Sequence, residues 1–119
     1  MSDQYVVENF KYSQFMLKDG ENPTWRVTFR GNDLHEVSLQ NATTGNYFAW
    51  DSGNEAITQA NEPYWWHVPK GPTPDDVYML QVKLYGEYVN LALKYNPNPE
   101  LGLETGQGGD EAKWRFVPA

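Results

Sequence analysis

A short tryptophan pattern that occurs three times constrains the fold of this chain more than any other feature. Trp25-Arg26-Val27, Trp66-His67-Val68 and Trp114-Arg115-Phe116 each place a tryptophan and an apolar residue two positions apart. Residues two apart point to the same face of a β-strand. The pattern predicts three structural units of about 40 residues, with the three tryptophans in a shared core.

Short alternating segments between turns predict an all-β chain. Residues 37–41 and 77–82 alternate apolar with polar side chains, and residues 41–45 and 51–54 are rich in turn formers. No stretch keeps the apolar spacing of a helix. Three hairpin units favour a closed barrel with a hairpin cap, because closure removes exposed sheet edges. The predicted fold is a β-trefoil.

The repeat divides one domain, residues 1–119, into units at approximately 1–36, 37–76 and 77–119. In each unit an aromatic or apolar strand precedes the repeat tryptophan, and the number of residues between the two differs from unit to unit. That distance is 10 residues from Phe15 to Trp25, but 18 from Phe48 to Trp66. We therefore expect the first unit to have lost a strand or a loop.

Charge and cysteine content narrow the possible partners. Sixteen acidic and nine basic residues give a net charge of −7, which repels nucleic acids, and the basic residues form no cluster for a membrane surface. The chain has no cysteine and its first residues show no signal peptide. We expect a cytoplasmic monomer or weak dimer that neither binds nucleic acid nor inserts into membranes.

The sequence also lacks the arrangements that catalysis requires. It has no cysteine nucleophile and no G-x-S-x-G motif that could work with His35 or His67. His67 is expected to face solvent on its strand. Asp75-Asp76 lacks the spacing of a calcium loop. We predict no enzyme activity, no cofactor and no metal site.

Unit two resembles a known family. Its strand, the segment Thr44-Gly45-Asn46-Tyr47-Phe48 and the later Trp66-His67-Val68 are similar to the ricin-B-type repeat of many fungal lectins. The resemblance implies a β-trefoil that binds glycans or glycoproteins. The Gln-x-Trp of that family is absent, since the residues two before Trp25, Trp66 and Trp114 are Pro23, Tyr64 and Ala112.

Aromatic rings beside short amide and carboxylate side chains are the groups that bind sugars, because the ring stacks on the C–H face while the polar groups hold hydroxyls. Alternation sends Trp66 inward and therefore Trp65 outward. The predicted binding residues lie in unit two and, as a parallel set, in unit three: Trp50, Asp51, Asn54, Gln59, Asn61 and Trp65, then Asn90, Tyr95 and Asn96.

An alternative function is protease inhibition. The tail at residues 106–110, expected to be a hairpin loop, together with Trp114-Arg115-Phe116 looks like the end of the mycocypins, mushroom protease inhibitors on the same fold. Pro97 and Pro99 stiffen a second loop, and a stiff loop loses less entropy when it docks. The inhibitory segment would be residues 95–101 or 106–110.

Overall fold

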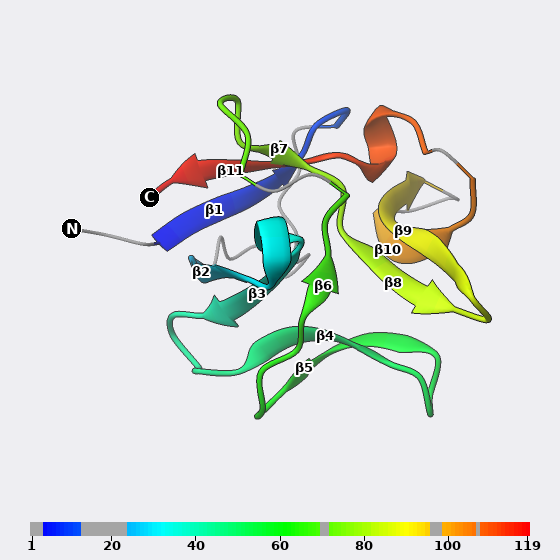
Figure 1. Ribbon diagram of the computed structural model, residues 1–119, viewed down its shortest axis with the longest axis horizontal. Coiled ribbons are helices and arrows are strands. Elements are labelled where there is room, and N and C mark those ends of the chain that lie inside the picture. Colours follow the sequence, from blue (N-terminus) through cyan, green and yellow to red (C-terminus); the bar gives the residue numbers. More distant parts are fainter. Residues whose placement is uncertain (1–3, 13–23, 70–71, 96–98, 107) are drawn as a thin grey trace.

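Short strands joined by tight turns make up most of the described chain. The computed structural model describes residues 4–12, 24–69, 72–95, 99–106 and 108–119. The first strands are β1 (Gln4–Asn9), β2 (Trp25–Arg30), β3 (Glu36–Asn41), β4 (Tyr47–Asp51), β5 (Ala56–Ala60) and β6 (Trp66–His67). The later strands are β7 (Val77–Tyr78), β8 (Gln81–Leu84), β9 (Glu87–Tyr95), β10 (Pro99–Glu104) and β11 (Trp114–Pro118) (Figure 1). Two 3₁₀ helices, η1 (Asn32–Leu34) and η2 (Asp110–Ala112), complete the described elements.

Antiparallel pairing links all of these strands into one sheet. The path runs β10-β9-β8-β6-β3-β2-β1-β11-β7, and the β4–β5 hairpin joins it through β3. β7 and β8 lie at different points of this path, yet only Met79 and Leu80 separate them in the chain. Because the described elements are strands apart from two short 3₁₀ helices, the all-β prediction is confirmed. Complete closure of the barrel stays a prediction.

The first and last strands lie side by side (Figure 1). β1 pairs with β11 over five positions, from Tyr5 opposite Pro118 to Asn9 opposite Trp114. β2 pairs with both β1 and β3, so it connects the first unit to the second. The expected loss in unit one falls on residues 13–23, which lie outside the described residues, and the boundaries between the units stay a prediction.

The three repeat tryptophans fill the core, as predicted. Trp25 is 1% exposed, and Trp66 and Trp114 are 0% exposed. Nε1 of Trp66 donates to the carbonyl of Phe48 at 2.9 Å, and Nε1 of Trp114 donates to the carbonyl of Leu91 at 2.9 Å. Both buried indoles thus satisfy their only polar atom on a strand of their own unit.

A buried asparagine ends the first strand of units one and two. Oδ1 of Asn9 accepts from the backbone N–H groups of Lys11 and Tyr12, at 3.0 and 3.1 Å. Oδ1 of Asn41 accepts in the same way from Thr43 and Thr44, at 2.9 and 3.2 Å. This Asx turn stops each strand and reverses the chain. The repeated asparagine is a second sign of the internal repeat.

Replacing Trp114 by alanine should lower the free energy of unfolding by about 3 to 5 kcal/mol, the range for deletion of a large buried ring. The substitution also leaves the carbonyl of Leu91 without its donor. Urea unfolding of Trp114→Ala beside Trp65→Ala measures the effect, since Trp65 is only partly buried. Equal losses in the two variants would contradict a special role for the repeat tryptophans.

Candidate functional site

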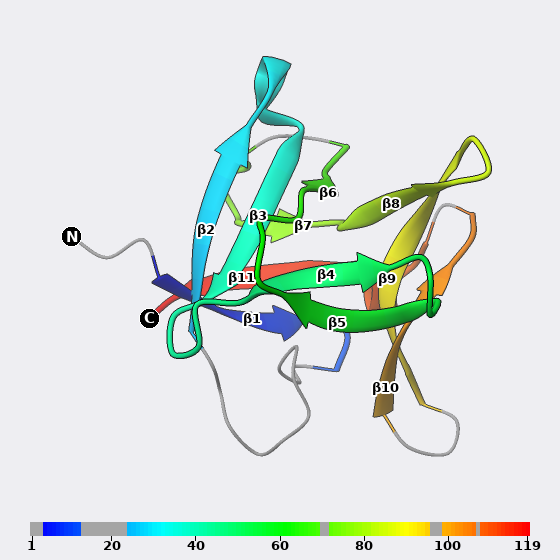
Figure 2. The ribbon, with the colours of Figure 1, turned by 90° about the horizontal axis from the view of Figure 1, so that it is seen from below.

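The β4–β5 hairpin separates the residues predicted to share one sugar site in unit two. Asp51 pairs with Ala56 beside the hairpin turn, whereas Tyr47 pairs with Ala60 at the opposite end (Figure 2). Asn61 follows β5 directly. At about 3.3 Å per residue, the four steps from Ala56 to Ala60 span roughly 13 Å. Asp51 and Asn61 therefore lie too far apart to hold the same sugar ring.

The carboxylate of Asp51 closes its own turn. Oδ1 accepts from the backbone N–H groups of Gly53 at 2.9 Å and Asn54 at 3.3 Å, and Oδ2 accepts from Nδ2 of Asn54 at 2.8 Å. The side-chain amide of Asn54, followed by these backbone donors, lowers the pKa of Asp51 from its ordinary value. The turn is exposed, but these polar groups already form hydrogen bonds with one another.

Trp50 belongs more to the core than to the surface. Its ring packs against the buried hydrophobic cluster. Its Nε1 is buried and has no hydrogen-bond partner among the described residues. Trp50 therefore offers only part of its ring to solvent, although it sits beside the exposed turn.

Gln59 and Asn61 lie at the base of the hairpin. Oε1 of Gln59 accepts from Nδ2 of the buried Asn41 at 3.4 Å, so this side chain supports the end of β3. Asn61 is exposed in the loop that leads to Trp65. Of the predicted amides in unit two, Asn61 is the one closest in the chain to that tryptophan.

Trp65 and Trp66 have opposite surroundings although they are neighbours. Trp66 is fully buried, whereas Trp65 is partly exposed beside the β2–β3 hairpin. The guanidinium carbon of Arg30 lies 3.9 Å from the centroid of the Trp65 ring. Nε of Arg30 also contacts Oε1 of Glu36 at 3.2 Å. Trp65 thus presents a flat ring face that is already occupied by a flat, positively charged group.

The predicted residues of unit three do not form a comparable surface set. Asn90 is 0% exposed. Its Oδ1 accepts from Nε2 of Gln81 at 2.8 Å and its Nδ2 donates to the carbonyl of Gly106 at 3.0 Å, so it holds the sheet to the following loop. The backbone of Tyr95 pairs with Pro99 in the β9–β10 hairpin. Asn96 lies outside the described residues.

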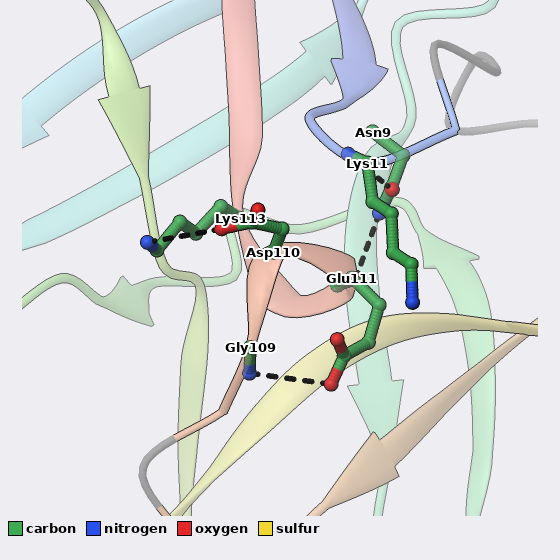
Figure 3. Close-up of polar contacts among 6 residues, drawn as sticks. All are labelled: Asn9, Lys11, Gly109, Asp110, Glu111 and Lys113. Carbon is green, nitrogen blue, oxygen red and sulfur yellow. Dashed lines mark hydrogen bonds and ion pairs between the residues drawn. The ribbon is translucent and has the colours of Figure 1, made fainter.

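The segment at residues 106–110 is not the hairpin loop that the sequence suggested. It joins β10 to β11, which pair with other strands, and it leads into η2. Figure 3 shows the N–H of Gly109 donating to Oε2 of Glu111 at 3.2 Å and Nζ of Lys113 contacting Oδ1 of Asp110 at 3.3 Å. Nδ2 of Asn9 donates to the carbonyl of Glu111 at 2.8 Å, which ties η2 to the end of β1 (Figure 3).

Gly108 tests how firmly this segment is held. A β-carbon there would lie 3.0 Å from the β-carbon of Ala112 and 3.0 Å from Nδ2 of Asn90, and the residue has φ +69°. Gly106 has φ +92° but nothing within 4 Å of such a carbon. We expect Gly108→Ala to lower the free energy of unfolding more than Gly106→Ala, which carries only the backbone penalty of about 1 kcal/mol. Equal losses in thermal or urea unfolding would contradict tight packing at Gly108.

Three stacked rings form a feature that the sequence analysis missed. The rings of His67 and Tyr88 stack with centroids 4.1 Å apart and an interplanar angle of 17°, and His35 stacks on His67 at 5.9 Å. Nδ1 of His35 lies 2.9 Å from the carbonyl of Val68. His67 is therefore partly buried between rings, contrary to the expected solvent-facing position. β6 pairs with β3 on one side and with β8 on the other, and β9 follows beside β8, so the order of the strands brings the three rings together.

Partial burial, and then the charge of His35, lower the pKa of His67 from its ordinary value of 6.5. The imidazole of His67 therefore binds a proton more readily in the unfolded chain than in the folded protein. The free energy of unfolding should fall as the pH drops below about 6.5 toward the lowered pKa. Urea unfolding across pH 5 to 7.5 should show a weaker fall in His67→Phe, which keeps a stacking ring. Identical pH profiles would contradict this origin.

Comparison with known proteins identifies the architecture. No protein-family model matches the sequence, and no curated protein matches it significantly. Among solved structures, a ricin B-like lectin of Macrolepiota procera in complex with lactose superposes with a TM-score of 0.69 at 18% identity, covering 98% of this chain and 97% of the lectin. The fold is a β-trefoil.

Two further β-trefoil structures agree. A designed threefold symmetric protein, ThreeFoil, has a TM-score of 0.72 at 14% identity, and the match covers 98% of this chain and 99% of ThreeFoil. The BEL β-trefoil, in an apo crystal form, has a TM-score of 0.70 at 11% identity, and the match covers 99% of this chain and 94% of the BEL chain. The fold prediction and the resemblance to ricin-B-type proteins are confirmed at the level of structure.

Proposed function

We propose that this β-trefoil binds carbohydrate through the surface around Trp65 and performs no catalysis. The observation that carries the proposal is the stacking of Arg30 on Trp65. An indole face is electron-rich and attracts a flat group with a positive edge, whether a guanidinium or the C–H face of a sugar. The lectin that shares the fold was solved with lactose, which supports this ligand class.

A sugar can displace the guanidinium of Arg30 from the face of the Trp65 ring. Its side chain is 51% exposed and its partner Glu36 is 41% exposed. A surface ion pair of this kind contributes only about 0 to 1 kcal/mol. A sugar that stacks on Trp65 would meet the displaced Arg30 and Glu36 as hydrogen-bonding groups for its hydroxyls. Asn61, exposed in the same loop, supplies an amide.

Asp51 and Asn54 are left out of this site, because they lie at the far end of the hairpin. Protease inhibition, the alternative function, gains no support from residues 108–110, since a β-carbon at Gly108 would meet Ala112 and Asn90 of the molecule's body. The other proposed inhibitory segment, residues 95–101, includes residues 96–98, which lie outside the described residues. Carbohydrate binding is therefore the function that the described residues favour.

Trp65→Ala should weaken binding of the best glycan from an array by about 1 to 3 kcal/mol, the scale for loss of a central aromatic anchor. Asp51→Asn, which keeps the acceptor that closes the turn, should bind as the parent does. Isothermal titration calorimetry on all three proteins measures both effects. The site is wrong if Trp65→Ala binds like the parent, and the function is wrong if a broad array yields no glycan at all.

A further inference from the structure

Tyr85 occupies a position that folding alone does not explain. Tyr85 and Gly86 form the two-residue turn between β8 and β9, where Leu84 pairs with Glu87. Both have positive φ angles, 51° and 81°. A hairpin turn of this kind favours asparagine, aspartate or glycine at its first position, and a bulky residue there is disfavoured.

The side chain of Tyr85 gains nothing from packing. Its relative exposure is 101%, the highest among the exposed large hydrophobic side chains of the described residues. Figures 1 and 2 show the β8–β9 turn projecting from the body of the molecule. An aromatic ring held in water on a disfavoured backbone is a sign of function, because such features persist at binding sites.

A second exposed ring lies on the same hairpin. Tyr88 is three residues further along, at most about 10 Å away along the chain, and is 44% exposed. His67 stacks on one face of this ring, and His35 stacks behind His67, so the orientation of Tyr88 is fixed before any ligand arrives. Nζ of Lys83 lies 5.7 Å from the ring centroid.

The exposed aromatic surface is large enough for a small ligand. A tyrosine can bury about 200 Å², so the two rings expose roughly 300 Å². A stable protein interface needs about 800 Å² on each partner. Lys83 pairs with Tyr88 across the hairpin and is exposed, so a charged group borders the apolar face of that ring.

We propose that Tyr85 and Tyr88 form a second carbohydrate site, separate from Trp65. Tyr85 stacks on a sugar ring, Tyr88 borders it, and Lys83, which shares a face of the hairpin with Tyr88, bonds its hydroxyls. The choice of a sugar as ligand rests on the proposed function. The site itself rests on the exposure and backbone of Tyr85, and it shares no residue with the surface around Trp65.

The experiment is an NMR titration of the folded protein with lactose, N-acetylglucosamine and methyl mannoside, with the ring signals of Tyr85 and Tyr88 and the indole signal of Trp65 followed separately. The test variant is Tyr85→Asn. Asparagine suits the turn, so the melting temperature should be unchanged or higher, while the apparent Kd reported by Tyr88 should rise at least about tenfold.

Leu34→Asn is the matched control. Leu34 is also exposed, at 42%, and also has a positive φ, 56°, but it lies in η1 on the β2–β3 hairpin. This variant should keep the affinity reported by Tyr88. An equal loss of affinity in both variants would overturn the site.

The remaining outcomes separate the two proposals. If a sugar shifts the Trp65 signal alone, or if Tyr85→Asn binds like the parent, the second site is wrong and the proposed function stands. If a sugar shifts the tyrosine signals alone, the second site stands and the site at Trp65 is wrong. If none of the three sugars shifts any of these signals, the second site is wrong, and the glycan array decides the proposed function by itself.

Discussion

The hydrogen bond from a buried indole to a strand of its own unit is the interaction on which this fold depends. Nε1 of Trp66 reaches Phe48 and Nε1 of Trp114 reaches Leu91, and in both units the acceptor lies on the strand that begins the central hairpin. The bond fixes where that hairpin leaves the core. Phe48 then contacts both Trp66 and Trp25, with ring centroids 5.3 and 5.7 Å apart, and so joins neighbouring units.

Much of the fold was predictable because the repeated positions carry large aromatic residues that favour burial in a core. The three tryptophans and the alternating segments predicted strands and core, and the structure agrees, whereas the boundaries of the units stay a prediction. The segment at residues 106–110 was misread, because glycines next to acidic residues suit both a hairpin loop and a packed turn. The pairing of β10 and β11 with other strands, and the lack of space for a β-carbon at Gly108, distinguish these alternatives.

The site was less predictable because ligand residues must converge in space. Asp51 and Asn61 are close in sequence, but the β4–β5 hairpin carries them to opposite ends. The reverse holds for His35, His67 and Tyr88, which are far apart in sequence and stacked in the structure. Strand order brings these rings together, and one sequence without its register does not give that order.

The pairing of β1 with β11 has a consequence for how the chain folds. Glu8 and Arg115 are 107 residues apart in sequence, yet they form an ion pair at 3.2 Å across these strands. Contacts between such distant residues slow folding, because a long loop must close first. During synthesis β1 lacks its second neighbour until β11, about 100 residues further along, has also been made. The edge of β1 is then open to pairing with other chains, and rapid docking of β2 and β3 would be its main protection.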